Sequence, residues 1–223
     1  MRLKILKMTN NNATPRVAVL MVMYNAQSYL GDCFSSLVNT DYPPDRWHVM
    51  VVDNASSDDT VAQLNFWKSH FQKLSIAMDI IESKENTAFA GGNNVAAAHA
   101  QQFNPDYLVL LNQDTVVNAN WLKELVAAGE SNNKIGIAQS LLLLHPQTNL
   151  INSLGNEIHF LGFGFSRGYR DPLSSITYNL EPRTYPEIPY ASGAAMLVRN
   201  SLYQQIGLFD EKYFMYHEDL DLC

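Results

Sequence analysis

The sequence predicts an α/β fold with a mostly parallel central sheet flanked by helices, and two observations support this. First, Tyr107–Leu111 (YLVLL) is a continuous apolar run, which is typical of a parallel strand buried on both faces. Second, apolar runs alternate four times with helix-like segments in the first 130 residues, the pattern of parallel strands joined by right-handed crossovers. With 47% hydrophobic residues among 223, the chain has enough apolar surface for a sizeable core.

The elements of this first part follow from the spacing of apolar residues. In the first helix, Leu30, Phe34 and Leu37 recur at helical spacing, and Pro43 and Pro44 come after its end because proline cannot continue a helix. The glycine-containing segment 85–94 (ENTAFAGGNN) is predicted as a loop. Strands are predicted at 17–23, 47–52, 74–81 and 107–111, and helices at 28–39, 60–71, 95–102 and 120–128.

After Lys134 the alternation ends. Apolar runs lie at 135–139 and 141–144, and a short strand is predicted at 194–198, followed by a small helix at 202–206. Between them, residues 149–189 are rich in glycine, proline and aromatic residues and show no clear period. We expect this segment to pack with its aromatic side chains toward a substrate, and those side chains are Phe160, Phe163, Phe165, Tyr169, Tyr178 and Tyr185.

The composition of the chain argues against several classes of protein. A net charge of −7 argues against a nucleic-acid-binding protein, although a metal can neutralise the phosphates of a nucleotide locally. The two cysteines, Cys33 and Cys223, form neither a zinc motif nor a disulfide framework, which fits a reducing cytosol. No apolar run approaches the ~20 residues that span a bilayer.

Polar residues gather where apolar runs or loops end. If the strands at 17–23, 47–52 and 107–111 are parallel neighbours, their carboxyl ends line one crevice, which is where α/β sheets bind ligands. Each cluster alone has a structural alternative, such as a turn cap or a tight bend. The four clusters are Tyr24–Asn25, Asp53–Asn54, Gly91–Asn94 and Asn112–Asp114.

Three of these clusters suggest a nucleotide ligand. Asp53 can accept a hydrogen bond from a ribose hydroxyl or a base. The pair Gly91–Gly92 lets the backbone approach a ligand, and a helix beginning at Asn94 would offer it free N–H groups. Asp114, beside an amide and a hydroxyl, is suited to Mg²⁺ or Mn²⁺ on a diphosphate.

Other nucleotide and hydrolase folds do not fit. The turn after the first strand, Tyr24–Gln27, has no glycine, which argues against a dinucleotide-binding fold. The sequence also has no GxxxxGK[ST] phosphate loop and no GxSxG nucleophile elbow.

The last acidic cluster suits a general base. Five carboxylates lie within twelve residues and are interleaved with aromatic residues, so burial there would raise a carboxyl pKa and improve it as a base. An acidic helix start is the structural alternative. The charged residues are Asp210, Glu211, Glu218, Asp219 and Asp221, with His217 beside them as a polar surface residue.

Several motifs together resemble family 2 glycosyltransferases of the GT-A fold, and most closely a rhamnosyltransferase-like bacterial branch. They occur in the family's order over nearly the whole chain. The matching segments are VMYN (22–25), VVDNASSDDT (51–60), ENTAFAGGNN (85–94), LLNQDT (110–115), SGAAMLVR (192–199) and GLFDEKYFMYHEDLDLC (207–223).

The resemblance implies a single GT-A catalytic domain over 15–223, with a nucleotide-binding half (15–130) and an acceptor-side half (131–223). The three asparagines at 10–12, followed by Pro15, predict that residues 1–14 are a flexible leader. The resemblance also implies a cytoplasmic, metal-dependent (Mn²⁺ or Mg²⁺), inverting transferase, with room for peripheral association at the inner face of the membrane. The donor expected is dTDP-rhamnose, or alternatively a UDP-hexose, and the acceptor a saccharide or lipid-linked saccharide of a cell-surface polysaccharide.

Site residues can be carried over by position. Asp53 resembles the residue that contacts the nucleoside, and Asp114 the metal-binding acid that ends the DxD motif. Glu218–Asp219 resembles the ED motif, which makes Asp219 the expected base and Glu218 the less favoured candidate. The residues expected to bind the donor nucleotide are Tyr24, Asn25, Asp53, Asn54, Gly92, Asn93, Asn94 and Asn112.

The sequence departs from this family in two ways. Asn112 stands where many members have Asp, which weakens the metal motif. The chain also stops at Cys223, where family members usually continue, so we expect an incomplete acceptor side.

Because of these departures, the alternative function is a non-catalytic or partner-dependent nucleotide-sugar-binding domain. A nucleotidyltransferase is disfavoured because Tyr24–Ser28 has no Gly-rich basic loop. The residues do not specify an oligomeric state.

Overall fold

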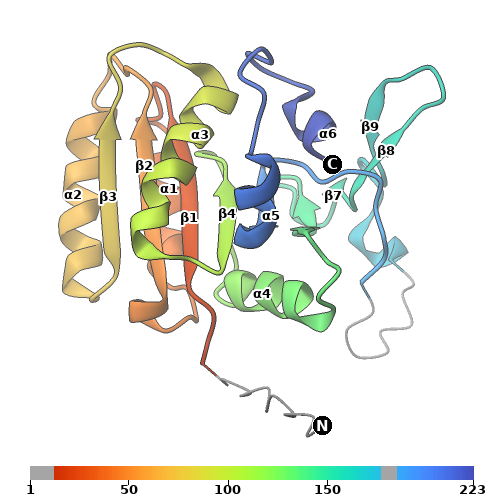
Figure 1. Cartoon of the computed structure of the whole chain (residues 1–223), viewed down its shortest axis with the longest axis horizontal. Helices are drawn as coiled ribbons and strands as arrows, with labels where there is room; N and C mark the ends of the chain where they lie inside the picture. Colours follow the sequence, from red (N-terminus) through yellow and green to blue (C-terminus); the bar gives the residue numbers. More distant parts are fainter. Residues whose placement is uncertain (1–12, 177–184) are drawn as a thin grey trace, which may run out of the picture.

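A six-stranded sheet forms the centre of the computed structural model, which describes residues 13–176 and 185–223. Its order is β3-β2-β1-β4-β10-β5, with β1 to β4 parallel and β10 antiparallel to both of its neighbours. This confirms the predicted α/β class with a mostly parallel sheet and a mixed second half (Figure 1). The strands are β1 (Val17–Met23), β2 (Trp47–Asp53), β3 (Ala77–Glu82), β4 (Tyr107–Leu111), β5 (Ile137–Gln139) and β10 (Ala195–Arg199).

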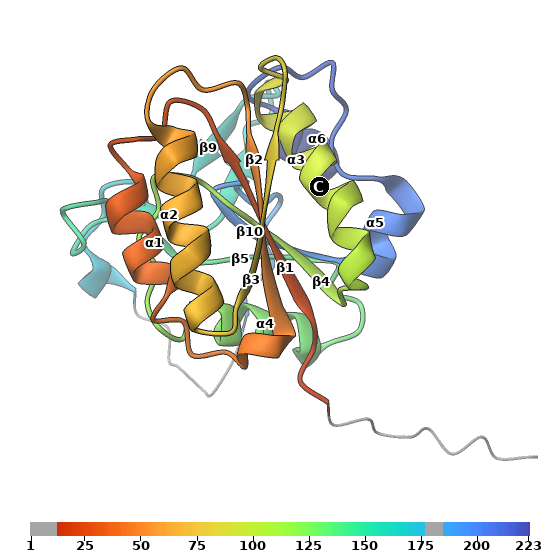
Figure 2. The ribbon, with the colours of Figure 1, turned by 90° about the vertical axis from the view of Figure 1, so that its left-hand side faces the viewer.

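Helices cover both faces of the sheet. Figure 2 shows α1 and α2 on one face and α3 and α5 on the other. The α-helices are α1 (Leu30–Leu37), α2 (Thr60–Lys73), α3 (Ala88–Ala100), α4 (Trp121–Ser131), α5 (Asn200–Ile206) and α6 (Glu218–Leu222). Three short 3₁₀ turns accompany them in the described ranges, namely Pro44–Arg46, Gln101–Phe103 and Leu173–Ser175. No helix in these ranges is both long and apolar enough to cross a bilayer.

Alternation along β1 divides the core into two layers. Val17, Val19 and Met21 pack against the side that holds α1, α2 and α4, whereas Ala18 and Leu20 pack against α3. All five side chains are fully buried. A strand buried on both faces must be apolar throughout, which is why the sequence showed a continuous run instead of an alternating pattern.

The start of α3 is the largest error in the predicted elements. The helix begins at Ala88, so the predicted loop 85–94 is mostly helix, and Gly91–Gly92 lie inside it. Glycine weakens a helix in isolation, but here it allows close packing. A Cβ at position 92 would lie 2.7 Å from Val22 Cγ1, so only glycine lets α3 approach β1 this closely.

The second half of the chain contains small antiparallel hairpins, formed by β6 (Leu142–Leu143) with β7 (Ile151–Ser153) and by β8 (Asn156–Ile158) with β9 (Gly164–Ser166). Here the expectation of a packed aromatic segment was wrong. Phe160, Phe163 and Phe165, like Tyr169 and Tyr185, are exposed. Tyr178 and most of the leader predicted at 1–14 lie outside the described residues.

An alanine at position 92 tests the packing of α3 on β1. Because a Cβ there would also lie 2.9 Å from Val22 Cγ2, and valine is stiff, helix and strand must separate to admit it. We expect Gly92→Ala to lower the free energy of unfolding by about 1–3 kcal/mol, the usual cost of overpacking, in urea denaturation. Gly31→Ala in α1 is the matched control, because nothing lies within 4 Å of a Cβ there. Equal stability of Gly92→Ala and the wild type would contradict this packing.

Candidate functional site at the carboxyl edge of the sheet

The carboxyl ends of β1 and β2 are held side by side. Met23 pairs with Asp53 in the parallel register, and the Asn54 N–H donates to the Met23 carbonyl at 2.8 Å. Beyond the strands, the Asn25 N–H donates to Ser56 Oγ, and the Ser57 N–H donates to Asn25 Oδ1, both at 2.9 Å. Asn25 therefore shapes the wall of the site by joining two loops.

Asp53 is a buried carboxylate with an unused acceptor. Only 3% of the residue is exposed, and Oδ2 accepts a hydrogen bond from the Ser56 N–H at 3.1 Å. Its Oδ1 has no hydrogen-bond partner in the described part of the chain. A buried polar atom without a partner is costly, so this oxygen is suited to a donor supplied by a ligand.

Asn54 is occupied with holding α3 in place. Its Nδ2 donates to the Ala88 carbonyl at 2.8 Å, and its Oδ1 accepts from both the N–H and the hydroxyl of Thr87. Ala88 adopts a positive φ of 56°, which is rare outside glycine, so this clamp supports a strained helix start. Asn54 thus positions α3, with its side-chain amide already hydrogen-bonded.

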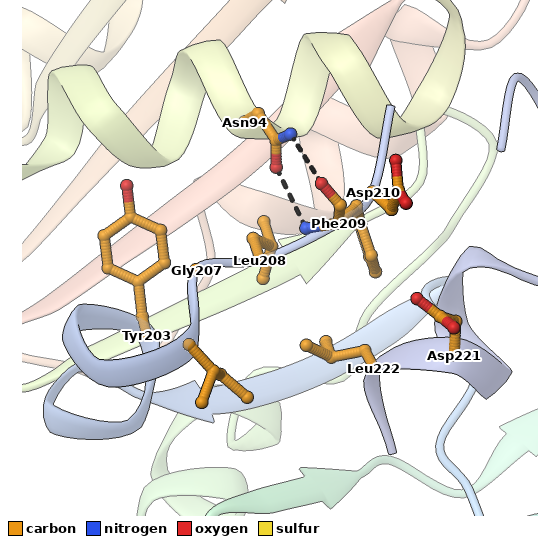
Figure 3. A pocket seen from close by; sticks show the side chains of 9 residues that line it. Asn94, Tyr203, Gly207, Leu208, Phe209, Asp210, Asp221 and Leu222 are labelled. Carbon is orange, nitrogen blue, oxygen red and sulfur yellow. Dashed lines mark hydrogen bonds between the residues drawn. The ribbon is translucent and has the colours of Figure 1, made fainter. Parts of the chain in front are cut away.

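Gly92, Asn93 and Asn94 have packing roles. Gly92 is buried against β1, and the buried Asn93 donates to the Phe89 carbonyl. Asn94 exchanges two hydrogen bonds with the backbone of Phe209, at 2.9 and 3.1 Å, as Figure 3 shows. It lines a cavity of about 480 Å³ between α3, α5 and α6, and the residues around that cavity do not include the acids at 53, 114 or 219.

Gln113 links the end of β4 to the end of β1. Its Oε1 accepts a hydrogen bond from the Tyr24 N–H at 2.9 Å. Gln113 has no separate role in the sequence-based prediction, because a polar residue after a strand is typical of a turn. The neighbouring Asp114 is exposed, and its carboxylate makes no hydrogen bond or ion pair with any described residue. The structure therefore presents this acid to solvent at the edge of the sheet.

The residues around Asp114 fit a divalent cation that shares its ligands with a substrate. Within residues 13–176 and 185–223, no three His, Cys, Asp or Glu side chains gather closely enough to hold a metal by themselves. Mg²⁺ and similar ions are commonly held by one or two carboxylates together with substrate phosphates and water. A free carboxylate at Asp114, beside the half-buried Asn112, provides that kind of partial site.

Asp219 is connected to the same edge through Gly193 and Ala194, the two residues that precede β10. The Gly193 N–H points at Asp219 Oδ2 across 3.5 Å, a long contact. The next residue, Ala194, accepts a hydrogen bond at 3.0 Å from the N–H of Asn112, at the end of β4. Two residues of one segment therefore connect Asp219 to the loop that carries Asp114. Sequence reasoning gave no role to Gly193 or to Tyr190, whose pKa is raised by burial and, to a lesser extent, by the nearby charge of Asp219.

The two acids at the start of α6, Glu218 and Asp219, are buried and half-buried, respectively. Burial raises the pKa of Glu218, and its Oε2 has no hydrogen-bond partner in the described residues. Burial also raises the pKa of Asp219, an effect that the Gly193 N–H partly offsets. The two residues before them, Tyr216 and His217, both have φ of 72°, an uncommon conformation that concentrates strain at this point. A carboxyl with a raised pKa is a better proton acceptor.

Comparison with known proteins shows which family these features belong to. The family described as glycosyl transferase family 2 matches residues 18–207. The low-salt glycan biosynthesis hexosyltransferase Agl10 of Haloferax volcanii is 24% identical over 217 residues, covering 93% of this chain and 60% of that protein. The chain thus spans less than two thirds of this relative. An N-acetylglucosaminyl-diphospho-decaprenol L-rhamnosyltransferase of Mycobacterium tuberculosis is 54% identical over 43 residues, 19% of this chain and 14% of that protein.

Solved structures agree on the fold. The mannosyltransferase PcManGT of Pyrobaculum calidifontis, solved with GDP-Man and Mn²⁺, has a TM-score of 0.63 at 19% identity, and the match covers 94% of this chain and 51% of that one. The predicted GT-A fold is therefore confirmed.

The raised pKa values of Glu218 and Asp219 predict a pH-dependent effect on stability. Both acids bind a proton more tightly in the folded than in the unfolded chain, so the stability they contribute is present at low pH and lost as the pH rises through the raised values. The variant Glu218→Gln/Asp219→Asn buries no charge there. We expect urea denaturation to show it gaining stability relative to the wild type between about pH 4 and pH 8. A difference that stays constant with pH would contradict the burial of these carboxylates.

Proposed function

The chain belongs to glycosyl transferase family 2, and from this premise we propose that it transfers a sugar from a nucleotide-sugar donor to a hydroxyl group of a saccharide or lipid-linked saccharide, with inversion at the anomeric carbon. Among nucleotide sugars, we propose dTDP-rhamnose as the donor, with a UDP-hexose as the alternative. The local likeness to a rhamnosyltransferase whose name specifies a diphospho-decaprenol acceptor supports both the rhamnosyl donor and the lipid-linked acceptor.

The main support for the proposal is a continuous set of contacts that joins Asp53, Asp114 and Asp219 along the carboxyl edge of the sheet. Asp53 pairs with Met23, the next residue Tyr24 bonds to Gln113, and Asp114 follows Gln113. From Asn112 the contacts continue through Ala194 and Gly193 to Asp219. A turn cap explains any one of these acids, but it does not explain why all three lie on the same set of contacts.

In the proposed complex, Asp53 binds the nucleoside. Its Oδ1 accepts a hydrogen bond from a ribose hydroxyl or a base N–H, which would satisfy the buried oxygen that has no partner. The exposed ring of Tyr24 lies next to the same strand end. Asn25 and Asn54 hold the loops and the helix start around the nucleoside instead of contacting it.

Asp114, with Asn112 beside it, would hold Mn²⁺ or Mg²⁺ together with oxygens of the diphosphate. When bound, the metal neutralises the charge that develops on the departing diphosphate. Asn112 is neutral, so Asp114 supplies the only negative charge of this short motif. Since Asp114 is not engaged by any described cation of the chain, it can bind without first breaking an ion pair.

Asp219 is the proposed general base. It accepts the proton of the acceptor hydroxyl while the hydroxyl oxygen forms a bond to the anomeric carbon. The bond from that carbon to the diphosphate breaks, and the diphosphate leaves with the electron pair. The raised pKa of Asp219 favours proton acceptance, and the Gly193 N–H orients one of its oxygens. Glu218 is buried and less able to reach an acceptor.

Replacement of Asp219 tests the assignment of the base. We expect Asp219→Asn to reduce turnover by about 10²–10⁴-fold, the usual contribution of general-base catalysis. The affinity for the nucleoside diphosphate, measured by calorimetry with Mn²⁺, should not change. Asp221→Asn is the control, because that acid is exposed on the same short helix. Full turnover in Asp219→Asn would refute the assignment, and donor binding without transfer by the wild type would favour a binding domain.

A further inference from the structure

The β8–β9 hairpin presents apolar side chains to solvent. Its strands pair Ile158 with Gly164, and the turn between them is closed by the His159 N–H, which donates to the Phe163 carbonyl at 2.8 Å. Phe160, near the tip, is 87% exposed. Large apolar residues normally avoid such a position unless it contacts something else. The exposed apolar side chains of the hairpin are Ile158, Phe160, Leu161, Phe163 and Phe165.

A second apolar loop lies on the same end of the molecule. Phe214, Met215 and Tyr216, which are separated from α6 by His217, are all more than half exposed. Figure 1 shows this loop and the hairpin both reaching the end of the molecule toward which β1, β2 and β4 point. Two separate segments therefore place exposed aromatic residues at one end, with α6 near them.

The base of the hairpin is connected to the proposed catalytic acid. The Asn156 N–H of β8 donates to the Tyr190 carbonyl at 3.2 Å, and β9 packs so closely on the Tyr190 ring that only glycine fits at position 164. Tyr190 in turn lies near Asp219. A surface that binds the hairpin tip is therefore held at a fixed position relative to Asp219.

We propose that the β8–β9 hairpin and the loop Phe214–Tyr216 insert into the interface of a lipid bilayer and hold the acceptor side against it. A narrow, convex tip suits a deformable bilayer, whereas a protein interface needs a broad complementary area. Such insertion draws on apolar area and does not require a membrane-spanning helix. It extends the proposed function by placing the acceptor hydroxyl at a lipid surface.

The local charge also fits lipid headgroups. In a chain of net charge −7, residues 158–170 contain no acid. Arg167 pairs with Glu157 of β8 at 3.3 Å, whereas Arg170 is exposed and makes no ion pair with a described residue. The guanidinium of the exposed Arg170 lies 5.7 Å from the centre of the Tyr169 ring. Arginine and tyrosine behind an apolar tip are the side chains that occupy the headgroup level, where each keeps its polar end in contact with water or phosphate.

Flotation with vesicles of phosphatidylcholine and phosphatidylglycerol tests the proposal. The assay contains neither donor nor acceptor, so lipid binding is measured separately from the transfer reaction. We expect the wild-type chain to float with the vesicles. Phe160→Ser/Leu161→Ser should weaken the partition by at least about tenfold, because two large apolar side chains no longer enter the lipid. Phe66→Ser on α2, at a phenylalanine that is 65% exposed, is the matched control and should bind like the wild type.

A second variant measures insertion directly. The fluorescence of Phe160→Trp should shift to shorter wavelength with vesicles and be quenched by brominated lipid chains. Absence of wild-type flotation, or equal loss in Phe66→Ser, would overturn the proposal. A dimer in sedimentation that the double variant dissociates, without lipid binding, would assign the tip to a second copy instead.

Discussion

The parallel register of β1 with β2 and β4 is the constraint on which the site depends. It brings three strand ends to one edge, where backbone groups that no longer pair within the sheet are free to hold loops. Two contacts beyond the sheet, from Tyr24 to Gln113 and from Asn112 to Ala194, then extend this edge toward α6. A change of register by one residue would turn the side chains at the strand ends to the opposite face and separate the acids.

The parts that could be predicted from the sequence are those that hydrophobic periodicity determines. The strand at Tyr107–Leu111 has the predicted bounds, and Asp53 at the end of β2 and Asp114 after β4 lie at the carboxyl edge as expected. The start of α3 could not be predicted in this way, because Gly91 and Gly92 read as a loop until β1 is known to lie beneath them. Tertiary packing outweighed the low helix propensity of glycine.

The structure of the irregular segment 149–189 was less predictable for a different reason. Aromatic residues serve equally in cores and at binding surfaces, so residues 149–189 did not indicate which side chains would be exposed. The role of Asp219 came from the resemblance to a family, since five acids in twelve residues do not distinguish themselves. Only the three-dimensional structure relates Asp219 to Gly193 and Tyr190, because those contacts join segments far apart in sequence.

The same features that suit the site to catalysis work against stability. Buried acids, an oxygen of Asp53 without a partner, and consecutive left-handed residues before α6 all raise the energy of the folded chain. A ligand that supplies the missing donors and a cation would remove part of that cost. In this account, then, donor binding and local stabilisation are two results of the same contacts.

The proposed function requires one donor molecule to contact Asp53 through its nucleoside and Asp114 through its metal-bound diphosphate. A crystal structure with Mn²⁺ and a nucleoside diphosphate, in which anomalous scattering locates the manganese, tests this requirement. We expect a manganese peak bonded to the Asp114 carboxylate, with the nucleoside hydrogen-bonded to Asp53. A metal and nucleotide bound elsewhere, with both acids left without contact, would contradict it.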